Sequence, residues 1–322
     1  MSKALVVGGA GYIGSHMVKM LLGEGHEVVT LDDLSGGYRD AVLGGAFVEG
    51  DLGDAALLDQ LFSSHQFDGV MHFASFIMVG ESVTDPGKYY ENNLAKTVTL
   101  LNALVRHEVK AFIFSSTAAI YGNPRYVPID EEHEAAPINP YGRTKWMVEQ
   151  ILQDFDHAHE LRSACLRYFN AAGADPDGEL GERHELENHL IPLVLRTASG
   201  KRDSITVFGR DYDTPDGTCI RDYIHITDLC QAHLLALQQL WEGAGSAAYN
   251  LGNGKGYSVQ EVIEMACEVT GLEIAVVEGE RRPGDAEKLI ADSSKAKASL
   301  GWEPKYPELS TIIEHSWNWE MR

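Results

Sequence analysis

The amino-acid sequence predicts an α/β protein built on a doubly wound parallel sheet, with a smaller mixed α/β domain in its C-terminal part. Three observations lead to this prediction. Short apolar strands alternate with amphipathic helical segments over the first 169 residues, and a glycine-rich turn directly follows the first strand. The alternation lapses near Asn170, where glycines and acidic residues cluster. Strands that alternate with helices are typical of a parallel sheet covered on both faces.

Composition and charge exclude several classes of protein. The 322 residues suffice for one large or two modest domains. The net charge of −22 argues against nucleic acid as a partner. We expect no membrane span, because no run of 18 or more apolar residues occurs, and the N-terminus has no cleavable signal layout. The four cysteines form no CxxC pair, which indicates reduced thiols in a cytoplasmic protein.

The first strand, residues 5–7, leads into a glycine motif. The motif has glycines at three spaced positions, Gly8, Gly11 and Gly14, and a helix over residues 15–22 follows it. Glycine permits a tight turn and lets backbone N–H groups approach a pyrophosphate at the helix N-terminus. The next strand, residues 27–31, ends at Asp32 and Asp33. Because Asp32 is placed to accept hydrogen bonds from a ribose hydroxyl, this Rossmann-type unit favours NAD over NADP.

The strands and helices that follow continue the same alternation. We expect strands at residues 46–52, 69–75, 111–114 and 163–168, and helices at residues 55–63, 89–106 and 141–156. The first of these strands carries Asp51, a candidate adenine contact. The C-terminal end of strand 69–75 should approach the cofactor, because ligands of such sheets bind at the carboxyl ends of the strands.

The second domain is predicted to start at about Asn170 and to be discontinuous. Residues 221–226 have the pattern of a strand, and Thr227 and Asp228 cap a helix that runs to Trp241. We expect residues 219–241 to rejoin the first domain, residues 1–169. The rest of residues 170–322, with a helix at residues 258–270 and a last helix in the tail after Trp302, would bind the substrate.

Tyr141 and Lys145 are the candidate catalytic pair. They follow Pro140, a residue that favours a helix start, and at four residues apart they lie on one helical face. A free Tyr has a pKa of about 10. A nearby cation favours the phenolate, so Lys145 makes Tyr141 a plausible proton acceptor. The spacing alone also fits a surface Tyr beside a solvated Lys.

Together with the glycine motif, this pair resembles the extended short-chain dehydrogenases/reductases. Further motifs between Ala4 and about Trp302 resemble the UDP-glucose 4-epimerases of that family; they lie at residues 72–74, 80–82, 89–93, 115–117, 121–122, 167–170, 221–225 and 281–285. The resemblance implies reversible C4 epimerisation of UDP-glucose and UDP-galactose, by transient oxidation to a 4-keto sugar with tightly bound NAD. It also implies a homodimer formed through residues 89–106 and 141–156.

The resemblance assigns roles to individual residues. Tyr141 would take the proton of the sugar 4-hydroxyl, Thr117 would hydrogen-bond the reacting oxygen, and Lys145 would hold the nicotinamide ribose and lower the pKa of Tyr141. The implied cofactor contacts are Gly8, Gly11, Tyr12, Ile13, Gly14, Asp32, Asp33, Asp51, Leu52, Phe73, Ala74, Asn92, Ser115, Tyr141, Lys145 and Tyr168. The implied substrate contacts are Thr117, Tyr141, Asn170, His189, Leu190, Val207, Arg221, Arg282 and Asp285. Arginine donors suit a diphosphate.

Several other functions are weighed against this one. A UDP-xylose/UDP-arabinose or UDP-N-acetylglucosamine 4-epimerase would use the same catalytic residues, and Leu289 stands where relatives set the size of the sugar pocket. A dehydratase would carry an Asp-Glu pair after Thr117, but Ala118 and Ala119 stand there. A non-catalytic NAD-binding protein would be expected to lose Tyr141, Lys145 or Thr117.

The segment from His184 to His189 superficially resembles a metal-binding HExxH motif. Its two histidines are five residues apart, so they would not share one face of a helix. We therefore expect no metal site.

Overall fold

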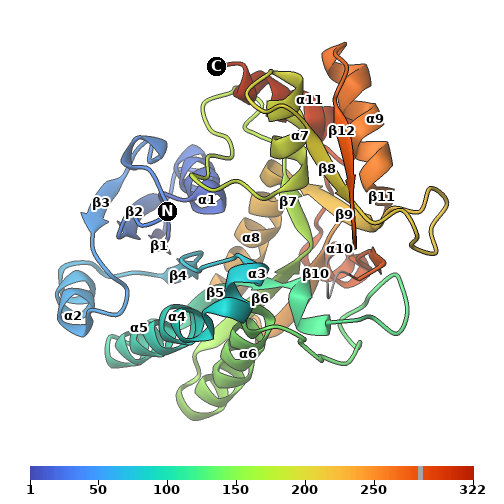
Figure 1. Ribbon diagram of the computed structural model, residues 1–322. Coiled ribbons are helices and arrows are strands. Elements are labelled where there is room, and N and C mark those ends of the chain that lie inside the picture. Colours follow the sequence, from blue (N-terminus) through green and yellow to red (C-terminus); the bar gives the residue numbers. More distant parts are fainter. Residues whose placement is uncertain (282–285) are drawn as a thin grey trace.

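A seven-stranded parallel sheet forms the large layer of the computed structural model, which describes residues 1–281 and 286–322 (Figure 1). Its strand order is β10-β6-β5-β4-β1-β2-β3. The strands are β1 (Lys3–Val7), β2 (Glu27–Asp32), β3 (Ala46–Glu49), β4 (Gly69–His72), β5 (Ala111–Thr117), β6 (Arg162–Tyr168) and β10 (Ala247–Leu251). The strand order reverses between β1 and β4, and ligands of doubly wound sheets bind at such a point. The predicted fold class is confirmed.

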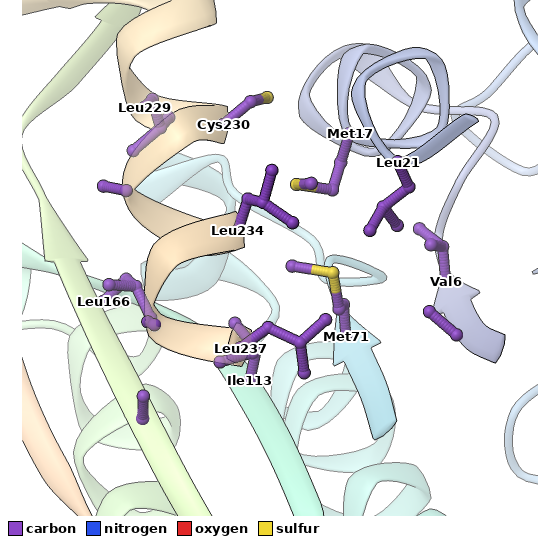
Figure 2. Packing of buried hydrophobic residues seen from close by; sticks show 14 of the residues in the cluster. Val6, Met17, Leu21, Met71, Ile113, Leu166, Leu229, Cys230, Leu234 and Leu237 are labelled. Carbon is purple, nitrogen blue, oxygen red and sulfur yellow. The ribbon is translucent and has the colours of Figure 1, made fainter. Parts of the chain in front are cut away.

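Helices cover both faces of this sheet. They are α1 (Tyr12–Gly23), α2 (Ala55–Ser64), α5 (Lys96–Arg106), α6 (Pro140–His159) and α8 (Ile226–Trp241). Successive side chains of a strand point to opposite faces, so Val6 packs with α1 and α8 whereas Leu5 and Val7 pack with α2, α5 and α6. Figure 2 shows the first of these cores, in which side chains of α1 and α8 meet those of the strands: Met17, Leu21, Leu229, Leu234, Leu237, Val6, Met71, Ile113 and Leu166.

Local signals in the sequence fix the start of α6. The Asn139 side chain accepts a hydrogen bond of 2.8 Å from the backbone N–H of Gly142, and Pro140 occupies the first helical position. This cap places Tyr141 in the first turn. The helix ends at His159, and Glu160, which follows it, adopts a left-handed conformation.

The helix expected at residues 89–106 is interrupted. It consists of α4 (Pro86–Tyr89), a π-helical turn η2 (Tyr90–Ala95) and α5. The wider turn rotates the side chains on either side of it, and single π turns inside α-helices are frequent at functional sites. The strands expected at residues 46–52 and 69–75 are also shorter than predicted, since β3 ends at Glu49 and β4 at His72.

The C-terminal half adds smaller sheets and a third core. β9 (Ile220–His225) pairs with β7 (Asn170–Ala172), β11 (Gly256–Ser258) and β13 (Lys288–Leu289), and β8 (Ile205–Phe208) pairs with β12 (Val276–Gly279). The helices α7 (Leu190–Ala198), α9 (Val259–Thr270) and α11 (Leu309–Glu320) pack around them. The remaining elements are α3 (Val79–Thr84), α10 (Ser294–Leu300), and the 3₁₀ turns η1 (Arg39–Ala41) and η3 (Ala118–Tyr121).

Part of the second half returns to the large sheet. α8 packs in its core, β10 forms its edge, and α10 packs against both. We expected residues 219–241, which contain β9 and α8, to rejoin the first domain together. Only α8 packs on the large sheet, whereas β9 belongs to the small sheet. The boundaries of the two domains stay a prediction. Among the described residues, no helix is long and apolar enough to cross a membrane.

Candidate active site

The glycine turn between β1 and α1 has two glycines that the fold itself requires. Gly8 has a positive φ of 80°, and a Cβ there would lie 2.5 Å from the backbone nitrogen of Ala74. A Cβ on Gly14 would lie 2.1 Å from the Gly8 carbonyl oxygen. Gly11, the N-cap of α1, is different, because a Cβ there would meet the protein only at an ordinary 3.5 Å. The space beside Gly11 is therefore open to a ligand.

A cavity lies directly on this turn. Its wall combines the turn and the start of α1, the segment after β2, the loop at residues 179–183 and one residue of α11: Ala10, Gly11, Tyr12, Ser15, Gly36, Asp40, Ala41, Glu179, Leu180, Gly181, Arg183 and Trp319. The phenol of Tyr12 donates a hydrogen bond of 2.6 Å to the carbonyl of Gly173, which directly follows β7, and so ties the start of α1 to the second half of the chain. Ile13 follows Tyr12 in the first turn of α1 and packs against the first core.

The carboxylate of Asp32 stabilises the glycine turn from the end of β2. Its Oδ2 accepts a hydrogen bond of 2.9 Å from the Ala10 N–H, and its Oδ1 accepts one of 2.8 Å from the Leu34 N–H. Burial raises the pKa of Asp32, although both hydrogen bonds favour the charged form. Asp33 beside it is exposed and accepts hydrogen bonds from Ser35. Carboxylate oxygens retain further acceptor capacity for a ribose diol.

Asp51 and Leu52 lie in the turn after β3 rather than in the strand. Asp51 forms an ion pair of 2.5 Å with Lys96 of α5 and accepts a hydrogen bond from the Gly53 N–H. Leu52 is buried in the core under α2 and α5. Phe73 and Ala74, by contrast, directly follow β4, and Ala74 touches Gly8 of the glycine turn.

Thr117 and Tyr141 meet at the carboxyl end of β5. Thr117 is the last residue of that strand, and Tyr141 lies in the first turn of α6; both are about nine-tenths buried. Thr117 lies close enough to Tyr141 for its hydroxyl to act as a donor that lowers the pKa of the phenol. Thr117 Oγ1 also accepts the Ala119 N–H at 3.1 Å, so its own hydrogen is free to be donated to Tyr141.

Lys145 lies one turn further along α6 but does not reach the phenol. Its Nζ donates hydrogen bonds to the Ser115 carbonyl at 2.7 Å and to Ser75 Oγ at 2.8 Å, and it lies 6.0 Å from the centroid of the Tyr141 ring. Burial lowers the pKa of Lys145 to about 7.

The expectation that Lys145 lowers the pKa of Tyr141 is not met in the structure. Burial raises the pKa of Tyr141, and the hydrogen bond from Thr117 offsets this only in part. The protein groups therefore do not lower the Tyr141 pKa below its usual value, because the Lys145 ammonium is held by Ser75 and Ser115 instead of by the phenol.

Other predicted cofactor residues lie at the same edge of the sheet. Ser115 and Tyr168, on the adjacent strands β5 and β6, share a hydrogen bond of 2.5 Å. Asn92 lies in the π-helical turn and donates to the amide oxygen of Asn93 at 3.1 Å. Asn93, which was not among the predicted cofactor contacts, is the buried one of the two, and its side-chain amide binds both the N–H and the carbonyl of Phe76.

A buried ion pair beneath α6 was also not foreseen. Arg167 of β6 and Glu149 of α6 pair at 2.6 Å, and both side chains are less than one-tenth exposed. Ser116 donates to Glu149 at 2.5 Å, and Arg167 donates to the Tyr121 hydroxyl at 3.0 Å. An Arg inside an apolar strand is the signal that could have revealed it, since a buried charge needs a partner.

The predicted substrate residues are dispersed over the second half. Asn170 and Arg221 lie on the paired strands β7 and β9, and Arg221 Nη1 donates to the Ile220 carbonyl at 2.8 Å. Leu190 begins α7, and the Val207 side chain is buried in the third core. Leu289 pairs with Arg221 across β13 and β9 and packs in a cluster with Ala118 beside Thr117. Arg282 and Asp285 lie outside the described residues.

The loop before α7 brings together two histidines and two glutamates. One ligand atom from each of Glu182, His184, Glu187 and His189 lies within 4.8 Å of the others. The sequence argument against a metal concerned a helix, but this segment is irregular, so residues five apart converge. Despite burial, the two carboxylates raise the pKa of His184 to about 9.

Comparisons with known proteins give one consistent answer. Residues 4–252 match the model of the NAD dependent epimerase/dehydratase family. The UDP-glucose 4-epimerase of Halalkalibacterium halodurans is 52% identical over 315 residues, which cover 98% of this chain and 94% of that protein. The UDP-glucose 4-epimerase of Rhizobium meliloti is 50% identical over 99% of this chain and 97% of that protein. The crystal structure of UDP-glucose 4-epimerase from Brucella ovis in complex with NAD superposes with a TM-score of 0.96, at 48% identity and 98% coverage of both chains.

Proposed function

Because the chain belongs to the NAD dependent epimerase/dehydratase family, we propose that it interconverts UDP-glucose and UDP-galactose by inverting the configuration at C4. One observation carries the proposal. The Tyr141 phenol and the Thr117 hydroxyl lie close together and are buried at the carboxyl end of β5, on the same edge of the sheet as the glycine turn. A proton acceptor at this edge supports the proposal, because a sugar hydroxyl beside a bound dinucleotide would lie within its reach.

The residues around the glycine turn fit NAD. The open space at Gly11 admits a pyrophosphate, the Asp32 carboxylate has acceptor capacity for a ribose diol, and Lys145 offers a donor to the second ribose. When bound, NAD supplies the two-electron oxidation and reduction that an unactivated carbon such as C4 requires.

The protein groups then handle the proton. Tyr141 accepts the proton of the 4-hydroxyl as the C4–O bond becomes a carbonyl, and it returns the proton to the same oxygen when C4 is reduced from its other face. Thr117 donates a hydrogen bond that stabilises the phenolate. The burial of both side chains keeps bulk water away from the ketone.

The test is the substitution Tyr141→Phe, with Tyr126→Phe as the matched control because Tyr126 is exposed. We expect turnover of UDP-galactose by Tyr141→Phe to fall by about 10²–10⁴-fold, the usual worth of a general acid–base group. Binding of UDP, measured by calorimetry, should be retained, and the control should keep full activity. A fully active Tyr141→Phe enzyme would refute the assignment.

We further propose a cytoplasmic homodimer. The cysteines of the chain, all of them free thiols, support the cytoplasmic location.

The dimer interface would lie on the helices over residues 89–106 and 141–156. Four apolar side chains in and before α3 and in α6 are more than one-third exposed, and α3 packs against α6. They are Ile77, Val79, Val83 and Met147. Sedimentation velocity should give twice the chain mass, and Met147→Glu should shift it towards the monomer.

A further inference from the structure

The loop between β7 and α7 contains a cluster with the composition and size of a metal site. His184 Nδ1 lies 3.2 Å from Glu182 Oε1 and 3.6 Å from Glu187 Oε2. His189 Nδ1 lies 3.5 Å from Glu187 Oε1 and is in direct hydrogen-bond contact with Glu182 Oε1. Ligand atoms around a tetrahedral zinc ion, with bonds of about 2.0–2.2 Å, are separated by roughly 3.3 Å. Three of these four distances already match that separation.

A second, independent observation points to an occupant. The Glu187 side chain is 1% exposed, and its Oε2 makes no hydrogen bond to any described residue. The nearest cation outside the cluster is Arg196, at the long distance of 3.9 Å. An ionised oxygen buried without a hydrogen-bond donor is costly, and this one is directed at His184 inside the cluster.

The charge and the donor atoms of the cluster favour a transition-metal dication over magnesium or calcium. Glu182 and Glu187 contribute two negative charges at side chains that are 6% and 1% exposed, and one dication that displaces the protons of the two histidines would cancel them. Magnesium and calcium prefer all-oxygen sites, whereas mixed imidazole and carboxylate donors suit zinc and its neighbours. By contrast, the acidic group of Asp175, Asp177 and Glu179 already surrounds a cation of the protein itself, since all three pair with the Lys19 ammonium.

We propose that Glu182, His184, Glu187 and His189 bind one divalent transition-metal ion, for which Zn²⁺ is the probe. Four protein ligands leave no open coordination position, so the role is structural. The ion would fix a loop that matters to the nucleotide site: Gly181 and Arg183 line the cavity on the glycine turn, and the Glu182 carbonyl accepts a hydrogen bond from Trp319. The proposal does not depend on the proposed epimerisation, because the ion takes no chemical step.

The experiment uses the full chain with NAD added. The protein is stripped with a chelator, incubated with Zn²⁺, and freed of excess metal by gel filtration before the zinc content and the melting temperature are measured. We expect one zinc ion per chain and a higher melting temperature, with no change from Mg²⁺. Co²⁺ in place of Zn²⁺ should give the intense visible bands of a four-coordinate ion.

Variants locate the ion. Glu187→Gln and His184→Gln should lose the zinc and the gain in melting temperature. Two exposed residues serve as controls: Glu185→Gln in the same loop and His157→Gln in α6 should keep both. Wild-type protein that retains no zinc, or variants Glu187→Gln and His184→Gln that retain as much as wild type, would overturn the proposal. If either variant fails to fold by circular dichroism, the wild-type zinc content and the Co²⁺ spectrum decide.

Discussion

Lys145 shows at the scale of one residue how burial and chemistry are linked. Its side chain is fully buried, and its pKa of about 7 lies below that of an unfolded lysine. Below about pH 7 both states carry the proton, and the cost of burying the charge is fully present. Between pH 7 and about 10.4 the unfolded chain binds more protons, so the unfolding free energy rises with pH.

We therefore expect the cofactor-free protein to gain stability from Lys145 as the pH rises from 7 to 9, by up to about 1 kcal/mol per unit. Urea unfolding at pH 7, 8 and 9 measures this slope. Lys145→Met should remove that part of the slope, whereas Lys110→Met, a lysine on the surface, should leave it unchanged. Equal slopes in wild type and Lys145→Met would contradict the prediction.

Two glycines of the turn differ in why they are needed: Gly14 is required by the fold, and Gly11 by the ligand. We expect Gly11→Ala to fold with a nearly unchanged melting temperature but to bind NAD weakly, because its methyl group would occupy the space open to the pyrophosphate. Gly14→Ala should fold poorly, since its Cβ would collide with the Gly8 carbonyl. Calorimetric titration with NAD and thermal unfolding distinguish the two. Normal NAD affinity in Gly11→Ala would count against the assigned pyrophosphate position.

Leu289 is placed to influence the choice of sugar. It packs in one cluster with Ala118 and Ile120, immediately after Thr117. We expect Leu289→Ala to increase turnover of UDP-N-acetylgalactosamine relative to UDP-galactose, because a smaller side chain leaves room for the acetamido group. A side-by-side assay that includes UDP-xylose measures this ratio. An unchanged ratio would show that Leu289 does not line the sugar pocket.

At the scale of elements, α6 is held to β6 by a charge pair inside the core. Removing one partner of a buried ion pair leaves the other charge uncompensated, which typically costs about 3–5 kcal/mol. We expect this loss of unfolding free energy in Glu149→Ala, measured with denaturant. Gln150→Ala, the next residue on the exposed face of the same helix, should change stability by less than about 0.5 kcal/mol. A loss as small in Glu149→Ala as in the control would mean that the pair is not structural.

The elements also show what sequence alone predicts. Long elements with a clear local signal were predicted: β5 contains a continuous apolar run, and the buried residues of α6 recur at helical spacing. The π-helical turn at Tyr90–Ala95 and the small-sheet strands of two to four residues were not, since they depend on tertiary packing. The same limit applies to the site. The glycine motif and the Tyr141–Lys145 pair are local in sequence, whereas the Lys145–Ser75 contact joins positions 70 residues apart.

At the scale of the whole molecule, the chain after residue 285 ties the small sheets to the large one. Trp302 is fully buried in the first core and donates to the Asp228 carbonyl at 2.9 Å. The Asp228 carboxylate accepts the N–H groups of Lys305 and Tyr306, which lead into α11 on the third core. Asp228 of α8 thus binds Trp302 in the first core through its carbonyl and the segment before α11 through its carboxylate.

We expect unfolding to occur in a single transition, reported identically by far-UV circular dichroism and tryptophan fluorescence. Trp302→Ala should lower the unfolding free energy by about 3–5 kcal/mol, the usual cost of truncating a buried Trp. Leu272→Ala, at an exposed site, serves as the control. Two separate transitions in the wild type would show that the sheets unfold independently.

The position of β10 at the edge of the large sheet has a consequence for biosynthesis. β10 pairs with β6, yet β7, β8 and β9 of the smaller sheets lie between them in the chain. A nascent chain therefore exposes the edge of β6 until residue 251 has left the ribosome, and Trp302 follows later still. Strand edges that stay unpaired are prone to association. Ribosomes stalled between residues 170 and 245 should thus carry chains whose large sheet is open along β6, and these lengths are where chaperones would be needed most.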